Sequence, residues 1–223
     1  MDPIERLGLI GDVHAEDGLL AAALAFLQRR ELDLILCTGD LADGPGSVKR
    51  CAELLQQAHV VTVAGNHDRW LLTGRMRQLP EATARGRLDR TTRRYLSELP
   101  KTVELETIHG KALLCHGLGE DDMARLHPDD YGYAIEQNWE LQELLRDRRY
   151  HFVLNGHSHH RMVRRFDHLT VINAGTLKRD HDPGFLMVDF ASGEATLLDL
   201  GPDGQVTFAL RTALDGAPTP LDG

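Results

Sequence analysis

Five apolar segments of the chain each end at a glycine that stands beside acidic, amide or imidazole side chains. The sequences at these ends are GDVH (11–14), GDLAD (39–43), GNHD (65–68), CHG (115–117) and GHSHH (156–160). Glycine permits the sharp turn that aims a side chain off a strand end, and polar sites in open α/β sheets form outside the carboxyl ends of strands. A lone Asp or His after a strand is more often a cap or a turn residue. Five such ends in one chain predict one shared site.

The first half of the chain alternates predicted strands and helices. Apolar runs predict strands at 6–10, 32–37 and 59–64, and helices at 18–30 and 47–58. Ser47 is the expected N-cap of the second helix, because its hydroxyl can accept a hydrogen bond from the first turn. The three strands lack polar alternation, which indicates burial on both faces and therefore a parallel sheet covered by helices.

The second half is richer in strands. Residues 69–98 are predicted to be helical, 102–107 and 111–115 to form a hairpin, and 134–149 to form another helix. Further strands are expected at 151–155, 161–166, 169–173, 184–190, 194–200 and 205–211. No repeat or linker divides the chain, so residues 1–212 are expected to be one domain and 213–223 a disordered tail.

Composition narrows the classes of protein. Of 223 residues, 42% are hydrophobic and 26% charged, as in soluble globular domains, and the net charge of −9 argues against a general nucleic-acid or membrane-surface binder. Cys37 and Cys115 lie in apolar runs, and three cysteines cannot all pair, which favours a reducing compartment. The N-terminus MDPIERLGLI is acidic where a signal peptide is basic, and the longest apolar run, GLLAAALAFL, is too short to cross a bilayer. A cytoplasmic location is therefore expected.

The complete, ordered set of motifs resembles the calcineurin-like metallophosphoesterases over most of residues 7–176. The resemblance implies two divalent cations that share a bridging aspartate, Asp40. One cation would be held by Asp12, His14, Asp40 and His159, and the other by Asp40, Asn66, His116 and His157. Oxygen and imidazole ligands without thiolate suit manganese, iron or zinc. Mn²⁺ is the preferred prediction, with Fe, Zn, Ni and Co as alternatives.

The same resemblance places His67 above the metals, where an imidazole can protonate a leaving alkoxide at neutral pH. Its orienting carboxylate is predicted to be Asp43, with Asp68 as the local alternative. Each aspartate also has a structural interpretation, since Asp43 could form an Asx-turn and Asp68 could be the N-cap of the next helix. Asn173 and Thr176, in NAGT, resemble a family segment near the metals but could equally form a simple turn.

Two further features bear on the substrate. The arginines between residues 69 and 94 are either a solvated, salt-bridged face or a cap that receives extra phosphates. They are Arg69, Arg75, Arg77, Arg85, Arg87, Arg90, Arg93 and Arg94. Gly44 stands where the related serine/threonine phosphatases and symmetrical diadenosine tetraphosphatases carry a phosphate-binding arginine. Its presence favours the bacterial and archaeal phosphodiesterase branch of the family.

The resemblance implies a four-layer α/β/β/α sandwich with two mixed β-sheets flanked by helices, the C-terminal strands building the second sheet. The implied activity is hydrolysis of a phosphodiester or nucleotide phosphate by a metal-bridging hydroxide. Alternatives are a phosphomonoesterase, a protein phosphatase, a dinucleoside polyphosphate hydrolase or a non-catalytic scaffold of the same fold. The expected partner is a phosphorylated small molecule or nucleotide. Nucleic acid is not favoured, no membrane partner is expected, and a homo-oligomer is left open.

Overall fold

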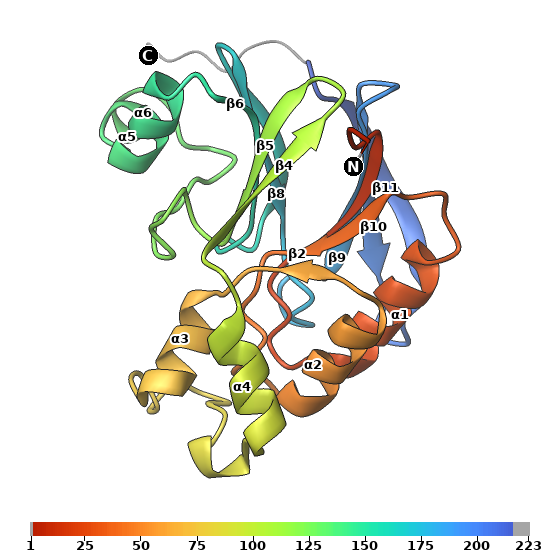
Figure 1. The fold of residues 1–223 in the computed structure, drawn as a ribbon, viewed down its shortest axis with the longest axis vertical. Helices are drawn as coiled ribbons and strands as arrows, with labels where there is room; N and C mark the ends of the chain where they lie inside the picture. Colours follow the sequence, from red (N-terminus) through yellow and green to blue (C-terminus); the bar gives the residue numbers. More distant parts are fainter. Residues whose placement is uncertain (1, 216–223) are drawn as a thin grey trace.

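Two β-sheets form the centre of the computed structural model, which describes residues 2–215 (Figure 1). The larger sheet has the strand order β11-β10-β9-β1-β2-β3. The neighbours β1, β2 and β3 are parallel, as predicted, while β9, β10 and β11 continue the sheet in antiparallel fashion. The strands are β1 (Arg6–Ile10), β2 (Leu34–Cys37), β3 (Val61–Thr62), β9 (Gly184–Asp189), β10 (Glu194–Leu200) and β11 (Val206–Ala213).

The smaller sheet has the order β4-β5-β6-β8-β7. Its first two strands form the predicted hairpin, with Thr107 paired to Gly110 at the turn. The central strands β5, β6 and β8 run parallel, and β7 returns antiparallel to β8. The strands are β4 (Thr102–Thr107), β5 (Gly110–Cys115), β6 (Tyr150–Asn155), β7 (Arg161–Phe166) and β8 (Leu169–Ala174).

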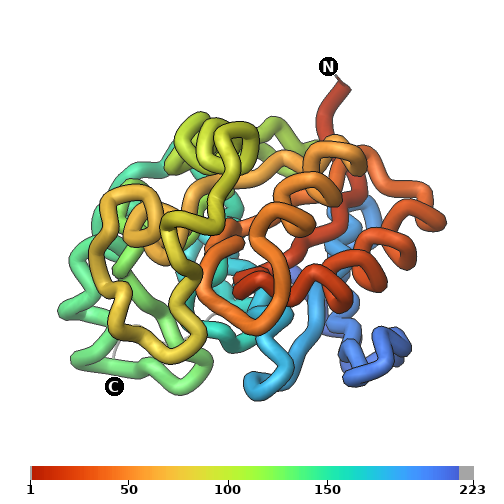
Figure 2. Tube along the Cα trace, turned by 90° about the horizontal axis from the view of Figure 1, so that it is seen from below, coloured from red at the N-terminus to blue at the C-terminus, as the bar shows by residue number. Residues whose placement is uncertain are grey.

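Helices cover the outer faces of both sheets. On the larger sheet lie α1 (Asp17–Leu27), α2 (Val48–Gln57), α3 (Asn66–Thr73) and α4 (Arg90–Glu98); Figure 2 shows α1 and α2, in red and orange, side by side. On the smaller sheet lie α5 (Tyr133–Glu136) and α6 (Trp139–Arg146). Three apolar cores fill the spaces between helices and larger sheet, between the sheets, and between smaller sheet and helices. The four-layer α/β/β/α sandwich is thus confirmed.

Some predictions of sheet membership and of helix bounds were wrong. The C-terminal strands were expected to build the second sheet. Of these strands, β7 and β8 do join the smaller sheet, but β9, β10 and β11 extend the larger one, because β9 pairs with β1. The helix expected at 134–149 is broken into α5 and α6 at Asn138, whose side chain accepts a hydrogen bond from Leu141 N and begins a new helix. Residues 69–98 are helical only in α3, α4 and one 3₁₀ turn (Arg85–Arg87).

The ends of the domain also need correction. Of the predicted tail 213–223, Ala213 belongs to β11 and Leu214 is buried, while 216–223 lie outside the described residues.

The Ser47 N-cap is confirmed, since its hydroxyl accepts from Arg50 N. Between residues 2 and 215, no helix combines the length and apolarity needed to cross a bilayer.

Candidate metal centre

The loops that follow β1, β2, β3, β5 and β6 meet at one point, as the five motifs predicted. The first group of potential ligands comprises Asp12 and His14, after β1, and His159, after β6. His159 Nε2 lies 3.1 Å from both Asp12 Oδ2 and His14 Nε2. Atoms that bind one ion at about 2.0–2.2 Å lie roughly this far from one another, so the three side chains fit a cation.

The second group comprises Asp40, His116 and His157, with Asn66 beside them. His116 Nε2 lies 2.9 Å from Asn66 Oδ1 and 3.3 Å from Asp40 Oδ2. The other ring nitrogen of His116 lies 2.8 Å from the carbonyl oxygen of Thr38, which assigns it a proton and leaves the Nε2 lone pair facing the two oxygens. Three electron-rich atoms that converge in this way suit a bound cation.

Asp40 lies between the two groups. Its Oδ2 is 4.0 Å from His14 Nε2 on one side and 3.3 Å from His116 Nε2 on the other. Its second oxygen accepts a hydrogen bond of 2.7 Å from the backbone of His67. This is the position that a bridging ligand would occupy, although the bridging role itself stays a prediction.

The site contains two carboxylates, Asp12 and Asp40, that are almost fully buried, and their negative charges are stabilised only by nearby positive charge. Burial lowers the pKa of the His116 imidazole, but the charges of Asp40 and Asp12 outweigh it and raise the pKa to about 10. Burial likewise raises the pKa of Asp40, but the proximity of His116 lowers it well below its usual range. Without other cations, a proton on His116 would balance this charge, and metal ions could do so instead.

The backbone of the site adopts conformations that L-residues rarely take. Six non-glycine residues in the loops of the site have a positive φ, a conformation that costs on the order of 1–3 kcal/mol each. They are His14 (45°), Ala15 (52°), Asp40 (48°), Asp43 (67°), His157 (65°) and His159 (62°). Five of them are predicted site residues, so the surrounding structure holds the site in a strained geometry.

His67 lies in the first turn of α3, beside these ligands. Its Nδ1 lies 2.8 Å from Asp43 Oδ2, so Asp43 is the carboxylate that contacts this ring, and its orienting role stays a prediction. Burial lowers the pKa of His67, but the hydrogen bond to Asp43 and the charge of Asp40 raise it above its ordinary value. His67 also lies within reach of His14 and Asp40 as a potential ligand. Its bond to Asp43 leaves only Nε2 free for either role.

Asp68 has a structural task, but not the predicted one. Gly65 is the N-cap of α3, and Asp68 sits inside the first turn. Its Oδ1 accepts from the backbone of Leu41 and Ala42, and its Oδ2 from Gly65. Burial and the nearby Asp40 raise the pKa of Asp68 to about 7. Through its three hydrogen bonds, Asp68 connects the loop that carries GNHD to the loop that carries GDLAD.

NAGT lies directly behind the ligands. Thr176 donates its hydroxyl proton to the carbonyl oxygen of Asp12 at 2.9 Å, and Asn173 donates to Gly156 O and Ser158 Oγ on either side of His157. His14 Nδ1 lies 3.0 Å from the carbonyl oxygen of Asp43. These contacts orient the imidazoles and the loops that carry them, which supports the outer-sphere interpretation of Asn173 and Thr176.

A cavity of about 300 Å³ opens over the ligands. Besides predicted residues it is lined by Trp70, Arg125, His127, Ser158, His160 and His181. Sequence reasoning missed Arg125, whose Nε donates to His157 Nε2 at 3.0 Å, and Trp70, whose ring centroid lies 4.7 Å from that of His67. His160 and His181 are exposed and line the cavity at its rim. No periodicity or motif marks Trp70, Arg125, His127 or His181, whereas Ser158 and His160 lie within GHSHH.

Most arginines of the 69–94 segment contact the protein itself. Arg69 makes two hydrogen bonds to Asp122, Arg77 two to Asp43, and Arg94 one to Glu98, while Arg85 and Arg93 donate to backbone carbonyls. Within residues 2–215, none of these arginines lines the cavity over the ligands. The salt-bridge interpretation is supported for the paired members.

A β-carbon on Gly44 would lie 1.7 Å from the carbonyl oxygen of His14, so this backbone admits only glycine there.

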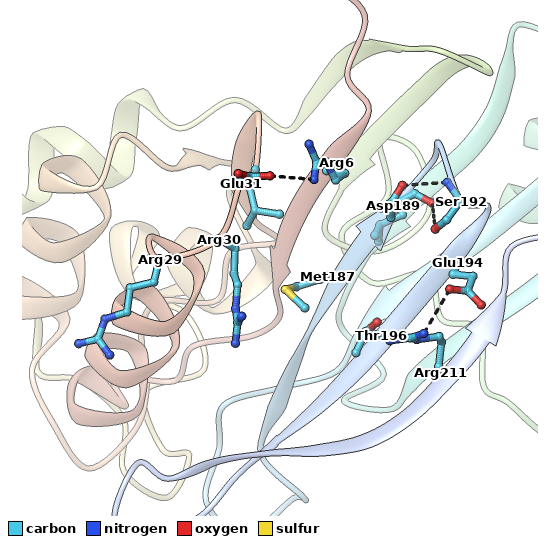
Figure 3. Close-up of a pocket in the computed structure, with 12 residues that line it drawn as sticks. Arg6, Arg29, Arg30, Glu31, Met187, Asp189, Ser192, Glu194, Thr196 and Arg211 are labelled. Carbon is cyan, nitrogen blue, oxygen red and sulfur yellow. Dashed lines mark hydrogen bonds and ion pairs between the residues drawn. The ribbon is translucent and has the colours of Figure 1, made fainter.

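A second hollow, of about 640 Å³, lies at the opposite end of β1 (Figure 3). It contains none of the predicted site residues. Two of its arginines face acids, with Arg6 3.5 Å from Glu31 and Arg211 3.7 Å from Glu194. Its composition is that of an ion-paired surface and not of a metal site.

Comparison with known proteins agrees with the fold. The model of the calcineurin-like phosphoesterase superfamily domain matches residues 6–193, and the chain therefore belongs to this superfamily. An uncharacterized protein of Methanocaldococcus jannaschii is 22% identical over 192 residues, which cover 81% of this chain and 73% of the relative.

Two solved structures show the same fold. A hypothetical protein from Pyrococcus horikoshii OT3 has a TM-score of 0.67 at 15% identity, over 92% of this chain and 86% of that one. A metallophosphoesterase from Sphaerobacter thermophilus has a TM-score of 0.61 at 23% identity, over 92% of this chain and 87% of that one. Family membership and the His/Asp clusters together support a hydrolase of phosphate esters.

Proposed function

We propose that the protein is a dinuclear metal-dependent phosphoesterase that hydrolyses phosphodiesters or nucleotide phosphates. The observation that carries the proposal is the arrangement of two ligand groups on either side of Asp40, beneath a cavity that also contains His67. The first cation would be held by Asp12, His14, Asp40 and His159, and the second by Asp40, Asn66, His116 and His157. Two bound cations would act as Lewis acids toward a phosphate oxygen and an attacking water.

His67 is suited to assist the leaving group. With Nδ1 bonded to Asp43, its Nε2 is the free nitrogen. Because the pKa of His67 is raised, the ring holds its second proton to a higher pH than free imidazole does. Nε2 can pass that proton to the leaving oxygen as the phosphorus–oxygen bond breaks, and regain one from water.

Arg125 is suited to bind the substrate anion. Among the described residues that line the cavity, it is the one arginine, and no lysine lines it. Its neighbour Leu126 is buried, and its carbonyl oxygen accepts from Asn138 Nδ2 at 2.7 Å, which fixes the backbone of the loop. One guanidinium matches the single charge of a diester better than the double charge of a monoester, which favours a phosphodiesterase.

The test compares bis-p-nitrophenyl phosphate with p-nitrophenyl phosphate as substrates, using protein stripped with chelator and reloaded with Mn²⁺. We expect two equivalents of metal and faster hydrolysis of the diester. One equivalent or less would contradict the dinuclear site, and preference for the monoester would contradict a diesterase. Two bound metals without activity on either substrate would instead indicate a non-catalytic scaffold.

Asp40→Asn tests the bridge directly. The substitution keeps the shape but removes the charge that both groups share, so both metals should be lost or weakened together. Activity should fall further than in any other single ligand variant, for example His14→Ala. Metal analysis of the reloaded variant is the readout, and two equivalents bound as tightly as in the wild type would refute the bridging role.

A further inference from the structure

The carboxylate of Asp43 has all of its hydrogen-bonding capacity in use. Oδ1 accepts from Arg77 Nη1 at 2.7 Å and from the backbone of Thr83 at 2.8 Å. Oδ2 accepts from Arg77 Nη2 at 2.8 Å and from His67 Nδ1 at 2.8 Å. A carboxylate held at both oxygens cannot rotate, and the fork of a guanidinium fixes its plane.

Arg77 is itself held in place. Its Nε donates to the carbonyl oxygen of Arg75 at 2.6 Å, and its Nη1 also reaches the carbonyl oxygen of Thr83. Thr83 closes the arrangement, because its hydroxyl accepts from the backbone of Asp43 at 3.0 Å. The stretch between α3 and the 3₁₀ turn thus encloses Asp43, which is almost fully buried beneath it.

Among the described residues, Arg77 and Thr83 make these hydrogen bonds to Asp43 and none to the potential metal ligands, so we interpret the enclosure of this carboxylate in terms of His67. A carboxylate without such partners could rotate about its side-chain torsions and turn away from the imidazole. The two bonds from Arg77 oppose that rotation. They also direct one oxygen of Asp43 at His67 Nδ1, and so direct Nε2 toward the cavity.

We propose that Arg77 is a positioning residue for the hydrolysis, acting through Asp43 to hold the His67 imidazole in its productive orientation. This inference rests on the proposed function and assigns one member of the arginine segment a role that differs from binding phosphate. Arg77 does not line the cavity over the ligands, so we expect it to affect the chemical step and to leave substrate binding unchanged.

Arg85 offers a matched control. It belongs to the same segment, and its Nη2 donates to the carbonyl oxygen of Leu72 at 3.0 Å, which ties the segment to α3 without touching Asp43. A purely structural role for Arg77 predicts similar effects of Arg77→Ala and Arg85→Ala. A positioning role predicts that they differ.

The kinetic test uses the full chain with Mn²⁺ and bis-p-nitrophenyl phosphate. Arg77→Ala should lower kcat by on the order of 10–100-fold, as loss of outer-sphere partners does, with KM unchanged. Arg77→Lys should restore part of this loss, and Arg85→Ala should keep the wild-type kcat. In a His67→Ala background, Arg77→Ala should cause no further loss. A rise in KM alone, or an equal loss in that background, would overturn the inference.

A spectroscopic test does not depend on activity. In metal-free protein with ¹⁵N-labelled histidine, the Nδ1 proton of His67 should appear at low field and vanish in His67→Ala. Arg77→Ala should shift or broaden this resonance and Arg85→Ala should not; an unshifted resonance in Arg77→Ala would overturn the inference. If the wild type hydrolyses no phosphate ester, the proposed function fails, while the resonance still decides whether Arg77 orients His67.

Discussion

At the scale of single residues, the site separates groups that hold charge from groups that act on a substrate. The potential ligands are buried except His159, which is half-buried, and the imidazoles of His14 and His116 contact the backbone carbonyls of Asp43 and Thr38. His67 and Arg125 face the cavity and differ in their supports: His67 is held by Asp43, and Arg125 by the backbone of its loop. Substitutions should therefore affect metal content, the chemical step or substrate binding separately.

His67→Ala should keep both metals but lose the chemical step. General acid catalysis contributes about 10²–10⁴-fold, and the loss should be greatest for alkyl or ribose leaving groups, which need protonation most. It should shrink for nitrophenolate, which leaves readily as an anion. Rates across a series of leaving-group pKa values, together with metal analysis, are the measurement. A uniform loss would point to phosphate binding, and a missing metal would make His67 a ligand.

Arg125→Ala should weaken substrate binding. A charge-assisted hydrogen bond contributes on the order of 1.5–3 kcal/mol, so kcat/KM should fall by roughly 10–100-fold, mostly through KM. Metal content should not change, because a guanidinium has no lone pair for a cation and Arg125 is therefore no ligand. Arg75→Ala is the control, since Arg75 is exposed and does not line the cavity. Equal effects of both substitutions would show that only general surface charge is involved.

At the scale of elements, continuous apolar runs marked most strands, and β1, β4, β7 and β10 have the predicted bounds. What local patterns could not show is which sheet a strand joins. β9 pairs with β1 across most of the chain, and this depends on long-range packing. The metal-type residues were found because motifs carry them, whereas Arg77 was one arginine among eight without any distinguishing signal. Its partner Asp43 is 34 residues away and is reached only through the fold.

The junction of α3 with the loop after β2 depends on Asp68. Asp68→Ala should leave three buried N–H groups without an acceptor and lower the free energy of unfolding by about 2–4 kcal/mol. Urea denaturation with chelator present separates this effect from metal binding. Asp89→Ala, which removes the half-buried N-cap of α4, should cost only about 0.5–2 kcal/mol. The prediction is wrong if the two variants are equally stable.

At the scale of the whole molecule, cations should stabilise the native state. Asp12 and Asp40 are buried next to each other, and bound cations neutralise charge that only the folded chain brings together. Ligand at 100 times its Kd adds about 2.7 kcal/mol to the free energy of unfolding. Urea midpoints in Mn²⁺ and in chelator are the measurement, with Asp40→Asn as the variant that should gain least. Identical midpoints for the wild type would contradict this expectation.

The position of the ligands at the ends of both sheets has a consequence for how the site is completed. Asp12, Asp40 and Asn66 follow strands of the larger sheet, whereas His116, His157 and His159 follow strands of the smaller one. A cation bound by such a set would be a cross-link between the two sheets, joining residues up to 147 positions apart. A chain that has folded only its larger sheet would present both carboxylates and the amide, but only His14 of the four ligand imidazoles. Tight metal uptake would then come after the sheets have docked, and bound metal per chain would count the molecules that have finished folding.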